Sequence, residues 1–223
     1  VETINLSKIQ PKLSISSTLS HLQQQQQYQQ HQNLPKISPS QLPVHNISPL
    51  WIKHDHRWTI TALVLSDDGT IAVTASQDGS IIKYELETGK RTIISRGTAK
   101  KGTGHKGAIY SLSLSSDNVF LASGGADSSV RIWNLQTNEC AHKFTRHRGV
   151  VRGVKFKRDS LSLFSVGDDR LVCLYDIEQM NFMETLYGHT KPIMAVEALY
   201  QDRVFTCGSD ATCRLWKLET ESQ

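Results

Sequence analysis

The chain has 223 residues, 25 Lys and Arg against 21 Asp and Glu, and a formal net charge of +4. This length suffices for one large domain or two small ones, and so mild a charge does not by itself indicate nucleic acid as a partner. No apolar run approaches the ~18 residues of a transmembrane helix, and no cleavable signal peptide is evident. We expect no membrane span and, since the chain begins with Val1 and not Met, a fragment of a longer protein.

The cysteines show neither a Cys-x-x-Cys pair nor the spacing of metal ligands. They are Cys140, Cys173, Cys207 and Cys213. Three of them lie inside apolar, strand-like runs, which predicts buried, reduced thiols in a reducing compartment. Nothing in the sequence points to a metal site or a cofactor.

Residues 1–49 form a polar, low-complexity stretch that includes "HLQQQQQYQQHQ". The stretch holds only four charged side chains and cannot bury enough apolar surface to offset its chain entropy, so we expect it to be disordered. A coiled coil is the weaker interpretation because apolar heptads are lacking. Strand-like sequence begins at Ser48. We expect residues 50–53 to form a strand that closes a ring of sheets by pairing with a final blade that this chain does not include.

From residue 56 onward the sequence repeats itself. Four segments align, namely "TASQDGSIIKYE" (74–85), "SGGADSSVRIWN" (123–134), "SVGDDRLVCLYD" (165–176) and "TCGSDATCRLWK" (206–217). Each has Ser or Thr, Asp four residues on and Trp or Tyr six residues later, and a histidine precedes the Asp by 22, 22, 22 and 21 residues. The four sets are His56, Thr74, Asp78, Tyr84; His105, Ser123, Asp127, Trp133; His147, Ser165, Asp169, Tyr175; and His189, Thr206, Asp210, Trp216.

Between these anchors lie short alternating runs split by turn residues such as "SDDG" and "ETGK", without helical periodicity. Four strands in a unit of about 42 residues are typical of a β-propeller blade. We therefore predict an all-β propeller over residues 50–223. Its blades are expected at about 56–95, 105–145, 147–187 and, incomplete, 189–223.

The anchors resemble those of the WD40 family, whose blades carry Gly-His near the start and Trp-Asp near the end. Gly-His is intact at 104–105 and 188–189. The Trp-Asp pair reads Tyr84-Glu85, Trp133-Asn134, Tyr175-Asp176 and Trp216-Lys217. The resemblance implies that about four of the family's usual seven blades are present, and that each His, Ser or Thr, Asp and aromatic set is a structural hydrogen-bonded tetrad.

Ser123, His105 and Asp127 also have the composition of a catalytic triad. The same trio recurs at every blade, however, without a nucleophile elbow or an oxyanion signature. A buried Asp needs hydrogen-bond partners, and the histidine and hydroxyl can supply them. We therefore expect structural tetrads, no enzyme and no small-molecule substrate.

The loop "SRGTAKKGTGHKG" (95–107) resembles a phosphate-binding loop but departs from it. Gly97 and Gly102 have the required separation, yet Thr103 and Gly104 stand where Lys and Ser or Thr are needed. The sequence that follows, "GAIYSLSLSS", alternates as a strand, so no helix N-terminus is available for an anion. We expect no nucleotide site there.

The sequence contains two basic runs without Asp or Glu, with six Lys and Arg in residues 90–106 and seven in residues 143–158. Parts of both fall in connections between blades, which cluster on one rim and can engage phosphates. The RNA-binding candidates are Arg96, Lys100, Lys101, Lys106, Arg146, Arg148 and Arg152. The alternative is a solvated rim without a ligand. Trp58, on the same rim, can stack on a base or pack on Arg57, and we favour packing.

Residues 51–223 closely resemble the WD-repeat proteins of the U3 small nucleolar ribonucleoprotein. The resemblance rests on "FTRHRGVVRGVKFKRDSLSLFSVGDDRLVCLYDI", on "METLYGHTKPIMAVEALYQDRVFTCGSDATCRLWKLETESQ" and on the Arg-Gly-x-x-Lys-Lys-Gly insertion at 96–102. It implies binding to the box B/C region of the U3 small nucleolar RNA beside a small kink-turn-binding protein. It also implies a role in pre-18S ribosomal RNA processing in the nucleolus, within the nucleus. The Gln-rich N-terminal stretch departs from the family's lysine-rich leader.

A generic protein-interaction scaffold is the alternative function, for example a substrate receptor of a cullin ubiquitin ligase. Such receptors often carry Trp-Asp-x-Arg at the end of the third strand. Gln136 and Glu178 stand at the Arg position in the second and third blades, so this signature is missing.

Overall fold

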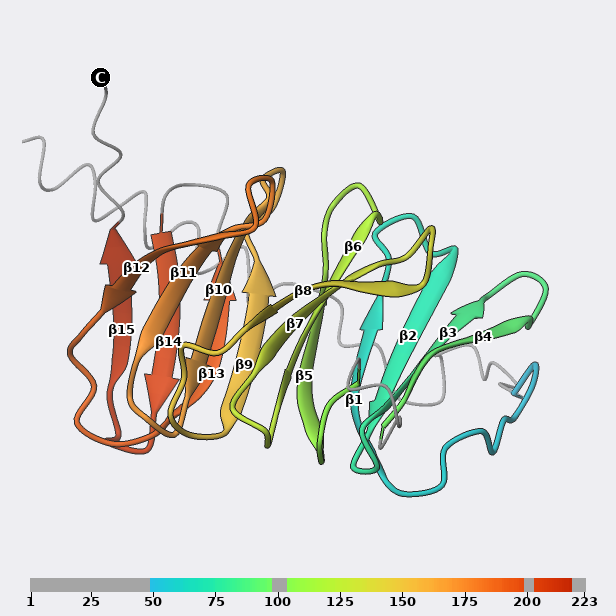
Figure 1. Cartoon of the computed structure of the whole chain (residues 1–223), viewed down its shortest axis with the longest axis horizontal. Coiled ribbons are helices and arrows are strands. Elements are labelled where there is room, and N and C mark those ends of the chain that lie inside the picture. The colour runs from blue at the N-terminus through green and yellow to red at the C-terminus, as the bar shows by residue number, and fades with distance from the viewer. Residues whose placement is uncertain (1–48, 98–103, 199–202, 218–223) are drawn as a thin grey trace, which may run out of the picture. The chain divides into compact units, whose positions relative to one another are not determined.

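The computed structural model describes residues 49–97, 104–198 and 203–217. These residues form strands and turns (Figure 1) and include no helix that could cross a membrane. The chain divides into two units, Val1–Leu50 and Trp51–Gln223, and every strand among the described residues belongs to the second. The stretch that we expect to be disordered lies outside the described residues, except for residue 49.

The strands form four antiparallel sheets, each built from consecutive strands. The first holds β1 (Ile60–Leu65), β2 (Ile71–Ser76), β3 (Ser80–Glu85) and β4 (Arg91–Arg96). The second holds β5 (Ile109–Leu114), β6 (Phe120–Gly125), β7 (Val130–Asn134) and β8 (Glu139–Phe144). The third holds β9 (Val151–Phe156), β10 (Ser162–Gly167), β11 (Val172–Asp176) and β12 (Asn181–Leu186). The described part of the fourth holds β13 (Ile193–Ala198), β14 (Arg203–Gly208) and β15 (Cys213–Lys217). This arrangement confirms the prediction of an all-β propeller.

The turns between strands have the chemistry that their sequences predict. After β1, Asp68 accepts hydrogen bonds from the Ser66 hydroxyl (2.5 Å) and the Thr70 backbone N–H (2.9 Å). The next residue, Gly69, has a φ of 69°, a left-handed conformation that glycine adopts without steric cost. Asp117 occupies the corresponding place after β5. Such local bonds end one strand and start the next.

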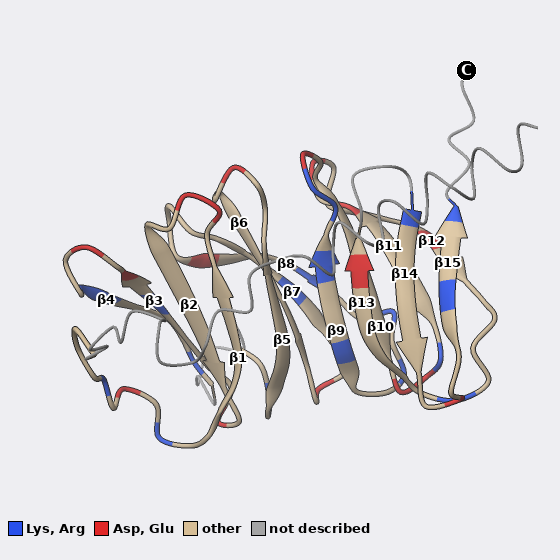
Figure 2. Cartoon of the chain, turned by 180° about the vertical axis from the view of Figure 1, so that it is seen from behind, with Lys and Arg blue, Asp and Glu red and all other residues tan. Residues whose placement is uncertain are grey.

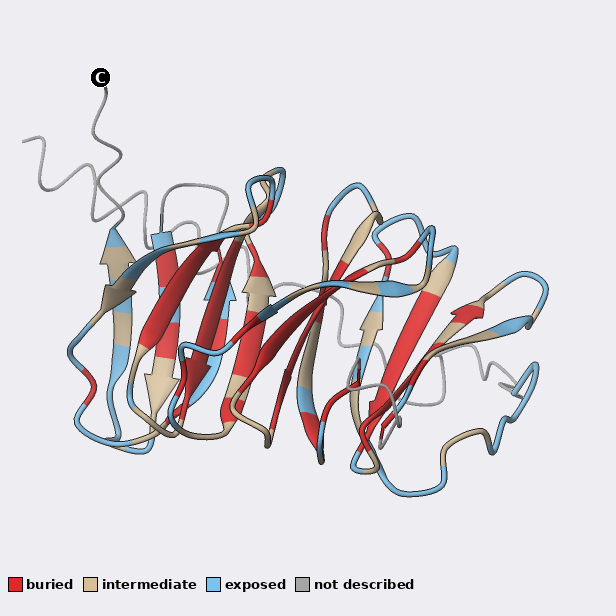
Figure 3. Cartoon of the chain, in the orientation of Figure 1, coloured by how far each residue is buried: buried red, intermediate tan, exposed pale blue. Residues whose placement is uncertain are grey.

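The core lies between neighbouring sheets, whose innermost strands β1, β5, β9 and β13 contact one another in chain order. Figure 3 shows the buried residues concentrated in the two middle strands of the first three sheets. Between the second and third sheets the rings of Phe144 and Tyr175 pack with centroids 4.4 Å apart. The packing is so close that a Cβ on Gly124 would lie 2.5 Å from Val151 Cγ1, which explains the glycine at position 124 of β6.

The residues before β1 lie against the first sheet. The Trp51 ring stacks on Tyr84 with centroids 5.7 Å apart. Residues 50–53 pair with no strand among the described residues. The blade with which we expect them to pair is not among these residues, so the closing strand stays a prediction.

The predicted burial of the cysteines holds only in part. Cys173 is buried, Cys140 and Cys207 are half-buried and Cys213 is exposed, and all four are free thiols. Cys207 and Cys213 are cross-strand partners in β14 and β15, with sulfur atoms 2.8 Å apart. The alternation of β15 explains the difference, since Cys213 points to the face opposite Trp216.

Candidate nucleic-acid interface

One end of the propeller carries both the connections that enter each sheet and the turns between its second and third strands (Figure 1). The connections contain the four repeat histidines, and the turns contain the four repeat aspartates. In three sheets the histidine Nδ1 lies 2.8 or 2.9 Å from an oxygen of that aspartate. We call this end the histidine rim; it comprises connections 54–59, 104–108, 145–150 and 187–192 and turns 77–79, 126–129, 168–171 and 209–212.

In the second sheet the tetrad residues form one chain of hydrogen bonds. The Trp133 indole N–H donates to the Ser123 oxygen (2.8 Å). His105 contacts Ser123 through Nε2 (2.7 Å) and Asp127 through Nδ1 (2.8 Å). The carboxylate of Asp127 accepts from Nδ1–H, so in a neutral His105 ring Nε2 carries no proton and accepts from the Ser123 hydroxyl. Burial lowers the pKa of His105, in agreement with a neutral ring.

In the third sheet a tyrosine replaces the indole, and the chain of donors runs the other way. The Ser165 hydroxyl donates to the Tyr175 oxygen (3.2 Å), so Ser165 can accept from His147 Nε2 (2.6 Å). His147 Nδ1 lies 2.9 Å from both carboxylate oxygens of Asp169. Burial opposes a charge on the ring, but the hydrogen bond to Asp169, the neighbouring Cys173 and the charge of Asp169 together outweigh it and raise the pKa of His147 to about 9. His147 is therefore an imidazolium at neutral pH.

The fourth sheet repeats the pattern of the second. His189 lies 2.9 Å from both Asp210 and Thr206, and the Trp216 N–H donates to Thr206 (2.9 Å). The His189 and Trp216 rings thus meet at the Thr206 hydroxyl.

The first sheet is different, because His56 contacts Ser80 and Thr74 (2.6 Å each) rather than Asp78. The Tyr84 hydroxyl donates to Asp55 (3.2 Å). Burial lowers the pKa of His56. The predicted set therefore lies together in this sheet without forming the same chain of bonds.

The hydroxyl groups of the tetrads are inaccessible to substrates. Ser123, Ser165 and Thr206 each have an exposed fraction of 0%. A nucleophile of acyl transfer has to reach the substrate carbonyl, which these groups cannot do. In the second, third and fourth sheets the tetrads join the entering connection to the turn after the second strand and so stiffen the histidine rim.

A hollow of about 900 Å³ opens on the histidine rim between the third and fourth sheets. Its walls come from the connections that enter these sheets, from the turn after β10 and from the end of β12. Its cationic side chains, all exposed, are Arg146, Arg148, Arg170 and Lys191. Figure 2 marks the Lys and Arg positions in blue. We call this site the basic hollow.

The two carboxylates that line the basic hollow are held by other groups. Arg152 binds Asp168 through Nε (2.8 Å) and a terminal nitrogen (3.0 Å), and Asp169 pairs with His147. None of the four lining cations has an ion pair to a described residue, and only Arg146 has a ring contact, with Phe182. The basic hollow therefore has an excess of positive charge, which suits a phosphate.

Family membership follows from the repeats. Residues 47–85, 98–134, 138–176 and 180–217 match the family model described as WD domain, G-beta repeat. The chain belongs to the WD40 family. Its four sheets are therefore WD40 blades, and we number them in chain order.

Several known WD40 proteins are similar to the chain. U3 snoRNP-associated protein-like EMB2271 of Arabidopsis thaliana is 30% identical over 179 residues, 75% of this chain and 37% of that protein. U3 small nucleolar RNA-interacting protein 2 of Homo sapiens is 31% identical over 120 residues, 52% of this chain and 25% of that protein. The crystal structure of the RRP9 WD40 repeats is 34% identical with a TM-score of 0.70, over 74% of this chain and 50% of that chain. The chain thus spans less than half the length of these curated relatives.

The basic hollow unites only two of the RNA-binding candidates, Arg146 and Arg148. Arg96 is exposed at the end of β4, and Lys106 is exposed while its backbone N–H donates to Asp127 (3.1 Å). Lys100 and Lys101 lie outside the described residues. Arg152 is held by Asp168, whose hydrogen bond raises the pKa of the guanidinium. Trp58, for which packing on Arg57 is expected, is 56% exposed.

Three side chains of the basic hollow escaped the sequence analysis, namely Arg170, Tyr187 and Lys191. Arg170 directly follows two aspartates, so a search for acid-free runs passes over it. Tyr187 and Lys191 flank the Gly-His of the fourth blade. Their closeness to this dipeptide in the sequence is the one feature from which their place on the histidine rim could have been predicted.

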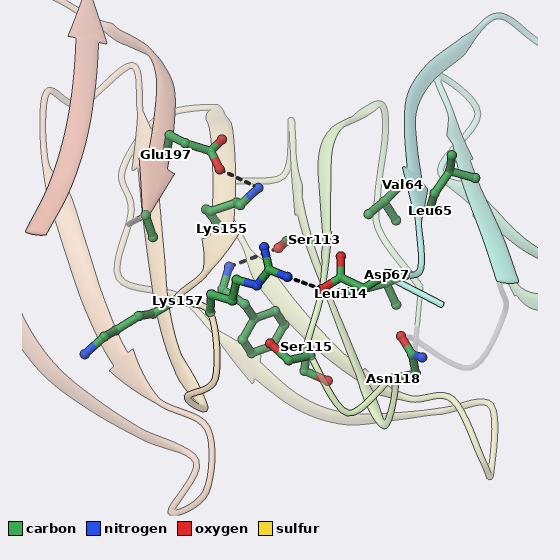
Figure 4. Close-up of a pocket in the computed structure, with 14 residues that line it drawn as sticks. Val64, Leu65, Asp67, Ser113, Leu114, Ser115, Asn118, Lys155, Lys157 and Glu197 are labelled. Carbon is green, nitrogen blue, oxygen red and sulfur yellow. Dashed lines mark hydrogen bonds and ion pairs between the residues drawn. The ribbon is translucent and has the colours of Figure 1, made fainter. Parts of the chain in front are cut away.

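A smaller hollow of about 320 Å³ opens among the innermost strands at the opposite rim (Figure 4). Two of its three cations have acidic partners, since Lys155 lies 2.6 Å from Glu197 and Arg158 lies 3.7 Å from Asp67. Figure 4 shows Lys155 and Glu197 pointing toward each other. Paired charges attract a phosphate less than unpaired ones, so we regard the basic hollow as the candidate site.

We expect the stability of the fold to fall as the pH rises above about 6.5. The folded pKa of His147, about 9, exceeds the unfolded value of about 6.5. Its contribution is therefore complete below pH ~6.5 and lost as the pH rises through ~9. Urea unfolding at pH 6 and pH 9.5 measures the loss. The variant His147→Gln should show a much flatter dependence, and an equal dependence in both proteins would contradict the assignment.

Proposed function

We propose that this WD40 chain is a non-catalytic component of the U3 small nucleolar ribonucleoprotein and binds the U3 small nucleolar RNA through its histidine rim. The observation that carries the proposal is the similarity to proteins named for U3 association, at 30 and 31% identity. The unpaired cations of the basic hollow supply a physical means of contact, because phosphate contacts dominate the affinity of proteins for RNA.

The finer assignment follows the same similarity. We propose the box B/C region of the RNA as the contact, a kink-turn-binding protein as a neighbour, and pre-18S ribosomal RNA processing in the nucleolus, within the nucleus, as the process. The histidine rim contributes a rigid cationic surface to such a particle, and the buried tetrads hold its connections in place.

Crosslinking in cells, followed by sequencing of the bound RNA, tests the proposal. Reads concentrated on the U3 small nucleolar RNA are expected. Recovery of proteins without RNA enrichment would favour a generic WD40 scaffold that docks peptides or ubiquitin-ligase substrates. That alternative is supported by the wide use of propellers as docking platforms, because a fold alone does not determine function.

The double variant Arg148→Gln, Lys191→Gln should weaken RNA binding and reduce its salt dependence. Two lost phosphate contacts lower the slope of log K against log salt by about 1.4 for single-stranded RNA. Titrations at several salt concentrations measure the slope. The matched control Lys90→Gln, Lys217→Gln removes the same charge from the opposite rim and should leave the slope almost unchanged. Equal slopes in both double variants would exclude the basic hollow as the contact.

A further inference from the structure

The basic hollow contains an aromatic ring that the fold does not use. Tyr187 follows β12 directly, lines the hollow and is 74% exposed. Its ring packs on no other aromatic ring among the described residues, unlike Tyr175, which packs on Phe144 and Phe182. Burial therefore does not account for an aromatic residue at this position.

The cations around Tyr187 differ in the contacts that they make within the protein. The Arg146 guanidinium lies 3.9 Å from the centroid of the Phe182 ring, a cation–π contact that fixes its plane. Arg148 and Lys191 have neither an ion pair nor a ring contact with any described residue. The hollow thus combines one free aromatic face with cations that can turn toward a ligand.

An aromatic face beside cations suits a nucleotide whose base is unpaired. In a double-stranded RNA the bases are stacked inside the helix, and proteins contact mainly the backbone and the shallow groove. An unpaired base can leave the stack and lie on an aromatic ring while its phosphate meets Lys or Arg. The volume of about 900 Å³ falls within the range of about 300–1,000 Å³ that is typical of sites for small organic ligands.

We propose that the basic hollow binds an unpaired nucleotide of the RNA, with the base stacked on Tyr187 and the phosphate held by Arg148 and Lys191. This inference rests on the proposed function and deepens it, since it specifies single-stranded RNA as the ligand. Stacking accepts any base, because every base has a π-face. The hollow therefore recognises the unpaired state of the nucleotide and not its identity.

Fluorescence anisotropy with the full chain tests the inference. The probes are an oligouridine of about 12 nucleotides and an RNA duplex of the same length. Tyr187→Leu removes the aromatic face from an exposed position and should weaken oligouridine binding by about 5- to 160-fold, the range that corresponds to loss of one stacked base. Tyr187→Phe keeps the face and should bind as the original chain does. Binding of the duplex should be equal in all three proteins.

Trp58→Leu is the matched control. Trp58 is also an exposed aromatic residue on the histidine rim, at 56%, but it does not line the basic hollow, so its loss should leave oligouridine binding unchanged. Oligouridine binding by Tyr187→Leu that equals the original would overturn the inference, even if the charge variants still weaken binding and so support RNA contact at the rim. If the original chain binds neither RNA probe, or binds only acidic or phosphorylated peptides, the RNA-binding function itself fails and the inference fails with it.

Discussion

Replacement of Trp133 by alanine should lower the free energy of unfolding by about 3–5 kcal/mol. The Trp133 side chain is 1% exposed and lies in the cluster between the first and second blades. Its removal leaves a cavity and also deprives the Ser123 oxygen of its indole donor. Urea denaturation monitored by circular dichroism measures the change through the midpoint and slope.

Two further variants separate the causes of this loss. Trp133→Phe retains most of the apolar volume and removes the indole N–H, so it should cost only about 1–2 kcal/mol. Trp58→Ala removes an indole that is 56% exposed and should change the stability by less than about 0.5 kcal/mol. If Trp133→Phe were as destabilising as Trp133→Ala, the hydrogen bond and not the packing would dominate.

The propeller could be predicted because the sequence features that specify it lie close together in the chain and recur at regular spacing. A histidine and an aspartate separated by 22 or 21 residues recur with a hydroxyl and an aromatic ring at constant offsets. Turn residues such as Asp68 and Gly69 mark where each strand ends. When four units share both the spacing of these residues and the turn residues, the fold class can be predicted without knowing which distant segments contact one another.

The candidate site could be predicted less well, because it depends on pairings between segments. Arg152 and Arg148 belong to the same basic run, but Asp168 from the next turn neutralises only Arg152. The positions of Arg170 and Tyr187 become meaningful only when the third and fourth blades meet. A run of charges in a sequence does not show which of its members are already paired.

The identity of the tetrad aromatic also has a consequence that spacing does not show. Trp133 can only donate, and His105 in that blade is neutral. Tyr175 can accept, and His147 in its blade carries a proton. The hydrogen bonds of the third blade thus run in the opposite direction to those of the second. A tyrosine alone does not produce a buried cation, because the pKa of His56 is lowered in the first blade, which carries Tyr84, and His147 has Cys173 as well as Asp169 beside it.

The charged state of His147 makes Asp169 the second position where a large effect is expected. Asp169→Ala removes the partner of a buried imidazolium and the acceptor of the Arg148 backbone N–H (3.0 Å). Loss of one member of a buried ion pair costs about 3–5 kcal/mol, and we expect this loss at pH 6. At pH 9.5 the loss should be smaller, because the original protein has by then lost the His147 proton, whose folded pKa is about 9.

Asp127→Ala is the matched comparison, since Asp127 occupies the same place beside the neutral His105. Its cost should arise from hydrogen bonds to a carboxylate, about 1.5–3 kcal/mol, and should hardly change between pH 6 and pH 9.5. Urea unfolding of both variants at the two pH values provides the measurement. A pH-independent loss for Asp169→Ala would mean that His147 is neutral in the folded chain.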